Sequence, residues 1–356
     1  MTDLPFGPAL FVARLLSWYR QAGRALPWRN TRDPYRIWLA EIMLQQTTVT
    51  TVIDYYRRFL EKFPRVEDLA AAPLEEVIDL WAGLGYYSRA RNLHATAQQL
   101  QSEFGGRFPE QVAALQQLPG IGRSTAGAVA ALAFEQAAPI LDGNVRRVLC
   151  RLCALQEPPR SSSAEKQLWS WSQQLTPVTR VHDYTQAIMD LGAILCTPTR
   201  PHCADCPVSD LCQARKSGLE QELPLKAAPK TIPTRRELTL LIRARGRYLV
   251  RRRPLEGFLG GLWEFPHVSL AAGDSVAKKL PWLLQEFGLT GEPEALGTVQ
   301  HLYSHFRLEA TVYLVETAAS PQVAEGEVGW LEKDQLERLA LHGAHKKIYN
   351  KVADSS

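Results

Sequence analysis

The sequence predicts a multi-domain protein, in which an all-α domain over residues 1–212 precedes an α+β domain over residues 235–356. The chain of 356 residues is long for one hydrophobic core and comfortable for two. Apolar residues recur at helical spacing as far as about residue 195, whereas short strand-like runs separated by turn residues follow residue 235. Residues 213–234 are rich in Lys, Pro and Ala without periodicity, so we expect an interdomain linker there.

Helical spacing defines the elements of the first domain in order. Helices are expected over 11–22, from Asp33-Pro34 onward, over 52–100 with breaks at 63–64 and 83–89, and again over 112–118 and 125–134. A further helix should begin at Asp142, and residues 164–195 should be helical. The second domain should contain strands at 238–242, 248–250, 297–303 and 306–315, a helix over 276–287 and a final helix.

Composition narrows the class of protein without fixing its function. The formal net charge of +4 permits binding to nucleic acid but does not argue for it. No window of about 18 apolar residues is present, and the first residues lack the basic and hydrophobic regions of a secretory signal. We therefore expect a cytoplasmic protein without membrane contact, whose six cysteines serve metal binding or burial rather than disulfides.

The turn at 119–122 is the first candidate site. Within the helix-turn-helix pattern of residues 111–134, Gly120 and Gly122 bracket one apolar residue, which allows close approach to another backbone. The amides at the start of the next helix, with the positive end of its dipole, can bind a phosphate. Pro-Gly-x-Gly alone is an ordinary interhelical turn in most proteins, so this feature by itself leaves the function open.

Two carboxyl groups are candidates for acid–base chemistry. Glu41 shares a helical face with Ile37, Trp38 and Leu44, and burial on such a face should raise its pKa. Asp142 stands at the mouth of a helix, whose dipole should keep it ionised. For an isolated Glu a solvated helix edge is the commoner situation, and Asp before Gly-Asn is most often only a cap.

Four cysteines with the spacing Cys196-x6-Cys203-x2-Cys206-x5-Cys212 indicate a metal centre in the loop 196–212. Tetrahedral zinc and a 4Fe-4S cluster are the two candidates, and the ligand type alone does not separate them. A second C-x2-C pair, Cys150 and Cys153, lies inside a helix beside apolar residues, so we expect buried thiols rather than ligands.

These motifs together resemble the helix-hairpin-helix DNA glycosylases, which include endonuclease III and the adenine DNA glycosylases of the MutY type. The segment from Leu118 to Gly122, followed at the expected distance by Asp142, carries the resemblance, and residues 38–47 resemble the catalytic-glutamate motif of the MutY type. The likeness extends from Trp28 to about Lys347. It implies a monomeric enzyme of base excision repair that removes adenine opposite 8-oxoguanine or guanine in double-stranded DNA, and it implies a 4Fe-4S cluster on the four loop cysteines.

The resemblance also assigns roles to individual residues. Cleaving an N-glycosidic bond calls for one neutral carboxyl group to protonate the base and one ionised carboxyl group beside the developing sugar cation. Glu41 is the expected acid and Asp142 the expected carboxylate, with Asn144 orienting either the water or Asp142. Gln46 and Tyr86 match the family's intercalating positions. The remaining expectations are that Arg29 and Gln186 contact the adenine and that Gly120, Gly122 and Ser124 contact DNA.

The second domain resembles a Nudix-type domain. A Nudix hydrolase needs several carboxylates to hold magnesium, and the helix here offers only Glu286 after Gln285, so no pyrophosphatase activity is expected. In the MutY type this domain recognises 8-oxoguanine through a Phe-Ser-His loop. Here Tyr303, Ser304 and His305 take those positions, with tyrosine in place of the phenylalanine.

Two alternatives remain beside this interpretation. A bifunctional glycosylase/lyase of the endonuclease III kind forms a Schiff base through a lysine two residues after the second hairpin glycine, and here that residue is Ser124, which cannot form an imine. A non-catalytic iron-sulfur DNA-binding protein would have no use for Glu41 and Asp142, because carboxylates repel phosphate.

Overall fold

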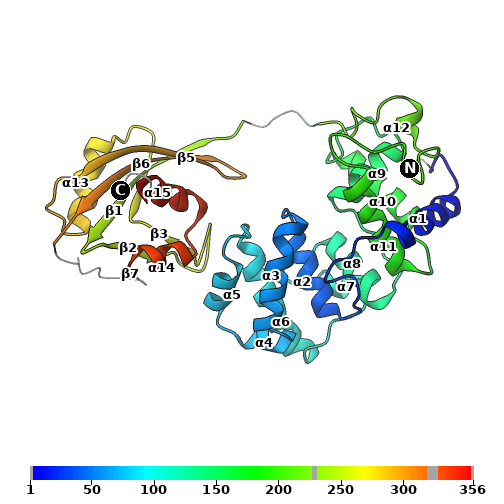
Figure 1. Cartoon of the computed structure of the whole chain (residues 1–356), viewed down its shortest axis with the longest axis horizontal. Helices are drawn as coiled ribbons and strands as arrows, with labels where there is room; N and C mark the ends of the chain where they lie inside the picture. The colour runs from blue at the N-terminus through cyan, green and yellow to red at the C-terminus, as the bar shows by residue number, and fades with distance from the viewer. Residues whose placement is uncertain (1–2, 227–230, 319–327, 354–356) are drawn as a thin grey trace. The chain divides into compact units, whose positions relative to one another are not determined.

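The computed structural model describes residues 3–226, 231–318 and 328–353, and contacts divide the chain into two compact units (Figure 1). We call Met1–Ala72 with Arg91–Ala228 the helical unit, and Pro73–Ala90 with Pro229–Ser356 the sheet unit. The helix α5 (Leu74–Trp81) therefore groups with the C-terminal residues rather than with its neighbours in sequence. Within the described ranges, no helix is both long enough and apolar enough to cross a membrane.

In the helical unit, α2 begins where a capping residue precedes an apolar pattern. Asp33 caps α2 by accepting from the Tyr35 amide at 2.9 Å, and Pro34 occupies the first helical position. Residues 164–195, expected to be helical throughout, divide into two α-helices and a π-helical turn, η1. The helices are α1 (Pro8–Ala22), α2 (Pro34–Leu44), α3 (Val49–Lys62), α4 (Val66–Ala71), α6 (Ser88–Phe104), α7 (Val112–Leu115), α8 (Arg123–Phe134), α9 (Gly143–Leu152), α10 (Ser162–Leu175), α11 (Val181–Asp190), η1 (Leu191–Leu195) and α12 (Gln213–Lys216).

The hairpin between α7 and α8 depends on the conformation of a glycine and on one hydrogen bond from α6. Gly120 has a φ of +73°, a conformation that favours glycine, and the hydroxyl of Thr96 donates to the Pro119 carbonyl at 2.8 Å. Further along α8, a Cβ on Gly127 would lie 2.4 Å from the Pro139 carbonyl oxygen. This close approach brings the segment that ends at Asp142 against α8.

The expected linker over 213–234 is too long at both ends. Residues 213–216 form α12, and Ala214 and Leu223 are buried in the helical unit. The buried Arg151 donates to the Leu223 carbonyl at 2.8 Å, a contact 72 residues apart that composition cannot reveal. Strand β1 already begins at Thr234, and residues 227–230 of the expected linker lie outside the described residues.

The sheet unit is built on a mixed seven-stranded sheet with the order β3-β2-β1-β6-β5, to which β4 and β7 add at β1 and β2. β1 and β6 are parallel over ten residue pairs, and the other pairings are antiparallel. The strands are β1 (Thr234–Ala244), β2 (Arg247–Arg252), β3 (Trp263–Glu264), β4 (His267–Leu270), β5 (Glu294–Leu302), β6 (Arg307–Glu316) and β7 (Val328–Leu331).

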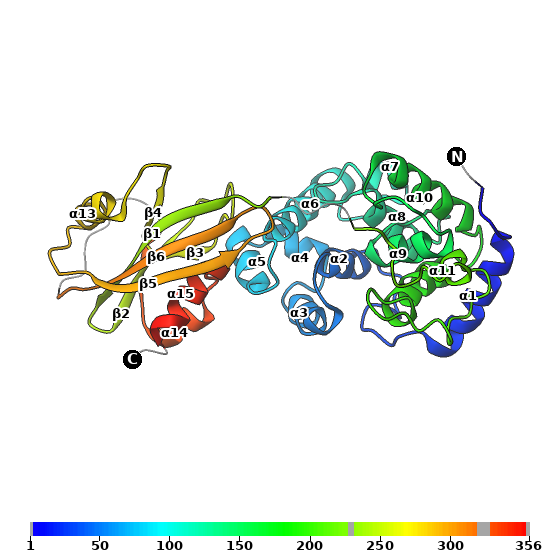
Figure 2. The ribbon, with the colours of Figure 1, turned by 90° about the horizontal axis from the view of Figure 1, so that it is seen from above.

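Helices cover both faces of this sheet, with α13 (Val276–Glu286) on one face and α14 (Lys333–Arg338) and α15 (Gly343–Ala353) on the other (Figure 2). Alternate residues of β1 supply the two cores. Leu241 packs with Ile348 and Tyr349 in one core, whereas Leu240 and Ile242 pack with Leu283 and Phe287 in the other.

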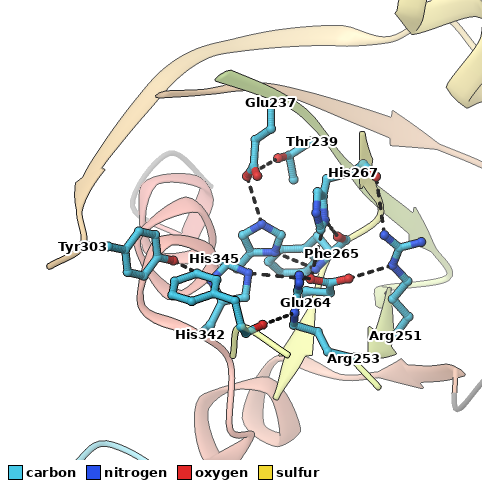
Figure 3. A network of polar contacts seen from close by, with 11 residues as sticks. Glu237, Thr239, Arg251, Arg253, Glu264, Phe265, His267, Tyr303, His342 and His345 are labelled. Carbon is cyan, nitrogen blue, oxygen red and sulfur yellow. Dashed lines mark hydrogen bonds and ion pairs between the residues drawn. The ribbon is translucent and has the colours of Figure 1, made fainter. Parts of the chain in front are cut away.

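A buried polar network joins the sheet to α15 (Figure 3). His345 accepts from the Phe265 amide through Nδ1 at 2.8 Å, so its Nε2 carries the proton and donates to Glu237 at 3.2 Å. Glu264 forms ion pairs with Arg251 and Arg253. Every charged group in this network therefore has a partner, as burial of polar groups requires.

Candidate active site

A single cavity in the helical unit collects the predicted catalytic residues. Its volume is about 250 Å³, which is small beside the roughly 300–1,000 Å³ typical of ligand pockets and suits one extruded base. Residues from α2, α9 and α11 and from the loop before α2 line it. Among them are Arg24, Trp28, Arg29, Glu41, Asp142, Asn144, Gln186 and Met189.

Glu41 projects from α2 into this cavity while its neighbours Ile37 and Trp38 are buried in the core. Burial raises the pKa of Glu41 to about 7; the charge of Asp142 also raises it, and Arg29 lowers it. The raised pKa expected from the apolar helical face is therefore confirmed. Near neutral pH a substantial fraction of Glu41 carries a proton that it can donate.

Asp142 caps α9, where its Oδ1 accepts from the Val145 amide at 2.7 Å. Burial nevertheless raises the pKa of Asp142, although the Val145 amide, Arg147 and Asn144 each lower it. The ionised form expected of Asp142 is thus favoured by the amides at the helix start and opposed by burial. Three neighbours favour the ionised form of Asp142, whereas the charge of Asp142 itself disfavours the ionised form of Glu41.

Asn144 connects Asp142 to the cysteine loop through Arg147. Its side chain hydrogen-bonds to Asp142, and its Oδ1 accepts from Arg147 Nη2 at 2.7 Å. The same guanidinium donates to the Gly192 carbonyl at 2.7 Å and to the Cys196 carbonyl at 2.6 Å. Of the two roles considered for Asn144, orienting Asp142 is the one that this geometry favours.

Arg29 and Gln186 lie together in the cavity wall and both are buried. Gln186 accepts from the Tyr19 hydroxyl, and its amide donates to His182 Nε2 at 2.9 Å and to the Arg29 carbonyl at 3.4 Å. These partners fix the orientation of the Gln186 side-chain amide in the cavity wall.

Four of the five predicted DNA-contacting residues are exposed. Gln46 and Tyr86 both adopt the left-handed backbone conformation, with φ of +58° and +49°, which is unusual for residues with side chains and typical of functional sites. Gly120 and Gly122 are exposed, and a Cβ on Gly122 would meet nothing within 4 Å, which leaves room for a phosphate. Ser124 is partly buried, and its Oγ accepts from the Leu141 amide at 3.0 Å.

The four loop cysteines surround one small cavity that Arg151 also lines. Arg151 Nη1 donates to Cys196 Sγ at 3.3 Å, and Cys212 Sγ donates to the Arg151 carbonyl at 3.4 Å. Cys150 is buried, and burial raises its pKa to about 12 and raises the pKa of Cys153 as well. High thiol pKa values suit the structural role expected for Cys150 and Cys153.

In the sheet unit, Tyr303 packs in an aromatic cluster with Phe258 and Phe306, and its hydroxyl lies 3.0 Å from His342 Nδ1. Ser304 and His305, which follow it, are exposed. Tyr303 thus anchors the loop, and the next two side chains are available to a partner. The Ser304 hydroxyl lies 3.3 Å from that of Tyr86, which belongs to the same unit.

Sequence reasoning missed five polar residues in or behind the cavity wall, namely Tyr19, Arg24, Arg147, His182 and Asp190. Their partners lie far away in the chain, as in the contact between Arg24 and Asp190, which are 166 residues apart. For Arg147 a signal was present, since the helix after Asp142 carries two arginines near its start.

Comparison with known proteins decides the family. Residues 39–174 match the model of the HhH-GPD superfamily of base excision DNA repair proteins, and residues 238–351 match the NUDIX domain. The adenine DNA glycosylase of Homo sapiens is 38% identical over 95% of this chain and 73% of its own length. The chain belongs to the adenine DNA glycosylase family. As a member of that family it is a DNA glycosylase of base excision repair, and both parts of the expected fold are confirmed.

Other relatives agree with this membership. The adenine DNA glycosylase of Buchnera aphidicola subsp. Baizongia pistaciae (strain Bp) is 35% identical over 96% of this chain and 97% of its own. Among solved structures, a thermostable thymine-DNA glycosylase aligns with a TM-score of 0.55 at 33% identity and covers 59% of this chain and 97% of its own. Endonuclease III in a non-covalent DNA complex has the same fold, with a TM-score of 0.51 at 24% identity over 59% of this chain and 96% of its own.

Proposed function

We propose that this enzyme is a monofunctional glycosylase that excises adenine opposite 8-oxoguanine or guanine in double-stranded DNA. The observation that carries the proposal is that Glu41 and Asp142 line the same small cavity as Arg29 and Gln186. A base-sized cavity containing one protonated and one ionised carboxyl group is what cleavage of an N-glycosidic bond needs.

The proposed reaction uses each group once. Glu41 donates its proton to a ring nitrogen of the extruded adenine, the bond from the base to the sugar C1′ breaks, and adenine leaves as the neutral base. The Asp142 carboxylate stabilises the positive charge that develops on the sugar, and Asn144 keeps that carboxylate in place. Water then adds to C1′ and loses a proton, which leaves an abasic site.

The decisive experiment is a single-turnover assay on duplexes that hold adenine opposite 8-oxoguanine, guanine or thymine, followed by heating in alkali to break abasic strands. We expect cleavage with the first two duplexes and little with the third. Glu41→Gln keeps the shape of the side chain but cannot donate a proton, so binding should survive while excision falls by several orders of magnitude. Normal excision by that variant would exclude Glu41 as the acid.

Monofunctional chemistry rests on Ser124, because the lyase alternative requires a lysine amine at that position. Borohydride trapping of the wild-type enzyme on a substrate duplex should yield little covalent product. Strong trapping would favour the glycosylase/lyase alternative. Cleavage of none of the duplexes, with retained DNA binding, would instead favour the non-catalytic alternative.

We also propose that Cys196, Cys203, Cys206 and Cys212 hold a 4Fe-4S cluster. The four thiols surround one cavity, and Arg151 donates to the sulfur atom of Cys196, a hydrogen bond of the kind that tunes an iron-sulfur cluster. The purified protein should contain iron and be brown, and Cys203→Ser should fold poorly; stoichiometric zinc without iron would overturn this assignment.

Recognition of 8-oxoguanine is assigned to the loop with Ser304, supported by its exposure and by its contact with Tyr86 in the same unit. The hydroxyl can hydrogen-bond to the altered edge of the oxidised base, a contact worth roughly 1 kcal/mol. Ser304→Ala should therefore reduce the preference for 8-oxoguanine over guanine opposite adenine by about fivefold. An unchanged ratio of the two excision rates at matched salt would remove Ser304 from recognition.

A further inference from the structure

Asp190 is the most enclosed charged residue near the cavity. It ends α11, its exposed fraction is 0%, and it does not itself line the cavity. Its carboxylate accepts four hydrogen bonds from two arginines: from the Arg24 amide at 3.0 Å, from Arg24 Nε and Nη2 at 2.8 and 2.6 Å, and from Arg29 Nη2 at 2.7 Å. Removing one partner of a buried ion pair is strongly destabilising, so this carboxylate holds both guanidinium groups in place.

Both arginines face the cavity that Asp190 does not reach. Arg29 stands beside Gln186, and its positive charge favours the ionised form of Glu41. Since Asp190 orients Arg29 from behind, its negative charge also offsets part of the positive charge that reaches Glu41.

The charges around this arrangement are few. The titratable side chains that line the cavity are Arg24, Arg29, Glu41 and Asp142. Behind them lie Tyr19 and Asp190, together with His182 and Asp183 on α11 and Arg147 beside Asp142. Arg24, Arg29 and Asp190 together carry one net positive charge, and changing any one of them changes that sum by one.

We propose that Asp190 is a positioning residue of the adenine cavity, which holds Arg29 against the base and limits the positive charge that acts on the Glu41 proton. This inference rests on the proposed role of Glu41 as the acid. It gives the end of α11 a task in the reaction although Asp190 contacts no reacting atom.

The proposal makes two predictions of opposite sign. Asp190→Asn keeps the shape but leaves a net charge of two, so Glu41 should lose its proton at a pH lower by roughly one unit, the size of shift that one neighbouring charge produces. Arg24→Gln makes the net charge of the three residues zero, so Glu41 should lose its proton at a pH higher by a similar amount.

The measurement is the single-turnover excision rate of the full chain from pH 5 to 9. For Asp190→Asn, with the midpoint moved from about 7 to roughly 6, the rate should fall about fivefold at pH 7 and remain close to wild type at pH 5. Arg20→Gln removes a charge from an exposed position on α1, so this control should keep the wild-type profile. A loss that is equal at every pH, or a shift of the same sign for both cavity variants, would overturn the proposal.

A second readout separates this inference from the proposed function. Carboxyl-labelled glutamate allows the Glu41 resonance to be titrated by NMR, with Glu41→Gln as the assignment control. Opposite shifts for Asp190→Asn and Arg24→Gln support the electrostatic role even if the wild type releases no adenine, an outcome that would reject the proposed function alone. If Asp190→Asn does not fold, the titration of Arg24→Gln decides, and an unmoved Glu41 resonance there overturns the inference.

Discussion

At the scale of single residues, Glu41 has the property on which the proposed reaction depends. Its pKa is raised to about 7 by burial first and by Asp142 second, against the effect of Arg29. Desolvation makes the largest contribution to this shift in pKa, and the two neighbouring charges make smaller ones. A protein needs this combination when a carboxylic acid has to donate a proton near neutral pH.

The excision rate should therefore fall as pH rises through about 7, because the deprotonated form of Glu41 cannot protonate adenine. Below that pH the excision rate should not change with pH until Asp142 takes up a proton. That proton removes the charge that stabilises the sugar cation. A pH series of single-turnover rates measures both limbs. A rate that stays constant between pH 6 and 9 would contradict the assignment of Glu41.

Residues that act directly on the base could be predicted from the sequence, whereas those that hold them could not. Glu41 and Asp142 lie in local patterns, an apolar helical face and a helix start, which a sequence displays. Asp190 gave no such signal, because its meaning comes from arginines more than 160 residues away. Polar pairing of this kind depends on the assembled fold.

At the scale of elements, η1 connects the cavity to the cysteine loop within five residues, since it follows Asp190 and ends before Cys196. A Cβ on Gly192 would lie 2.6 Å from the Cβ of Asn144 and 3.0 Å from its backbone. Only glycine allows this turn to pack against the start of α9. Its π-helical form was not predictable, because apolar spacing over five residues does not distinguish a π-turn from a continued α-helix.

Gly192→Ala should consequently displace Asn144 and the Asp142 carboxylate that it orients. A shift of this kind by about 1 Å should lower the single-turnover rate by roughly 100-fold, with a smaller effect on DNA affinity. Gly7→Ala, at a helix start with open space around it, is the matched control and should retain the wild-type rate. A fully active Gly192→Ala enzyme would show that Asn144 does not depend on this contact.

The network of Figure 3 predicts how the sheet unit responds to acid. Burial lowers the pKa of His342 and of His345 well below the ordinary value, so both stay neutral in the folded state. As pH falls through about 6.5 the unfolded chain binds protons that the folded chain does not, and the free energy of unfolding decreases. Between pH 7.5 and 5.5 the decrease should be about 1.4 kcal/mol for each histidine.

Urea denaturation at a series of pH values measures this slope. His345→Asn can still accept from the Phe265 amide but has lost the titrating ring, so its slope should be smaller by the contribution of one histidine. Its stability at pH 7.5 should be lower than that of the wild type, because Glu237 loses a donor. If the free energy of unfolding had the same dependence on pH in both proteins, His345 would take up its proton over the same pH range in the folded and unfolded states.

At the scale of the whole molecule, each unit has its own buried core. The helical unit encloses large side chains such as Trp38 and Phe59, and the sheet unit has separate clusters on its two faces. Calorimetry should therefore resolve two unfolding transitions. Cys203→Ser should lower only the transition of the helical unit, and His345→Asn only the other; if either variant shifts both transitions equally, the units do not unfold independently.

The change in periodicity near residue 235 predicted the order of the two domains. The sequence did not predict which segments make up each unit. Strands β3 and β7 have two and four residues, too short to show alternation, and they pair with β2 across 11 to 83 residues of sequence. Similarly, residues 73–90 have the apolar pattern of the other helices, and only contacts assign them to the sheet unit. Local patterns predict whether a segment is a helix or a strand. Contacts between segments far apart in the sequence decide which unit it belongs to.

The hydrogen bond between Ser124 and the Leu141 amide bears on how lyase activity could arise or disappear in evolution. In this chain the hydroxyl holds the residue just before Asp142, so the side chain at position 124 already has a structural task. A lysine there would bring an amine but would leave the Leu141 amide without its acceptor, next to the carboxylate on which excision depends. A lineage that acquired the amine would also need a compensating change near Leu141. Without that change, the single variant Ser124→Lys should be a poor adenine glycosylase.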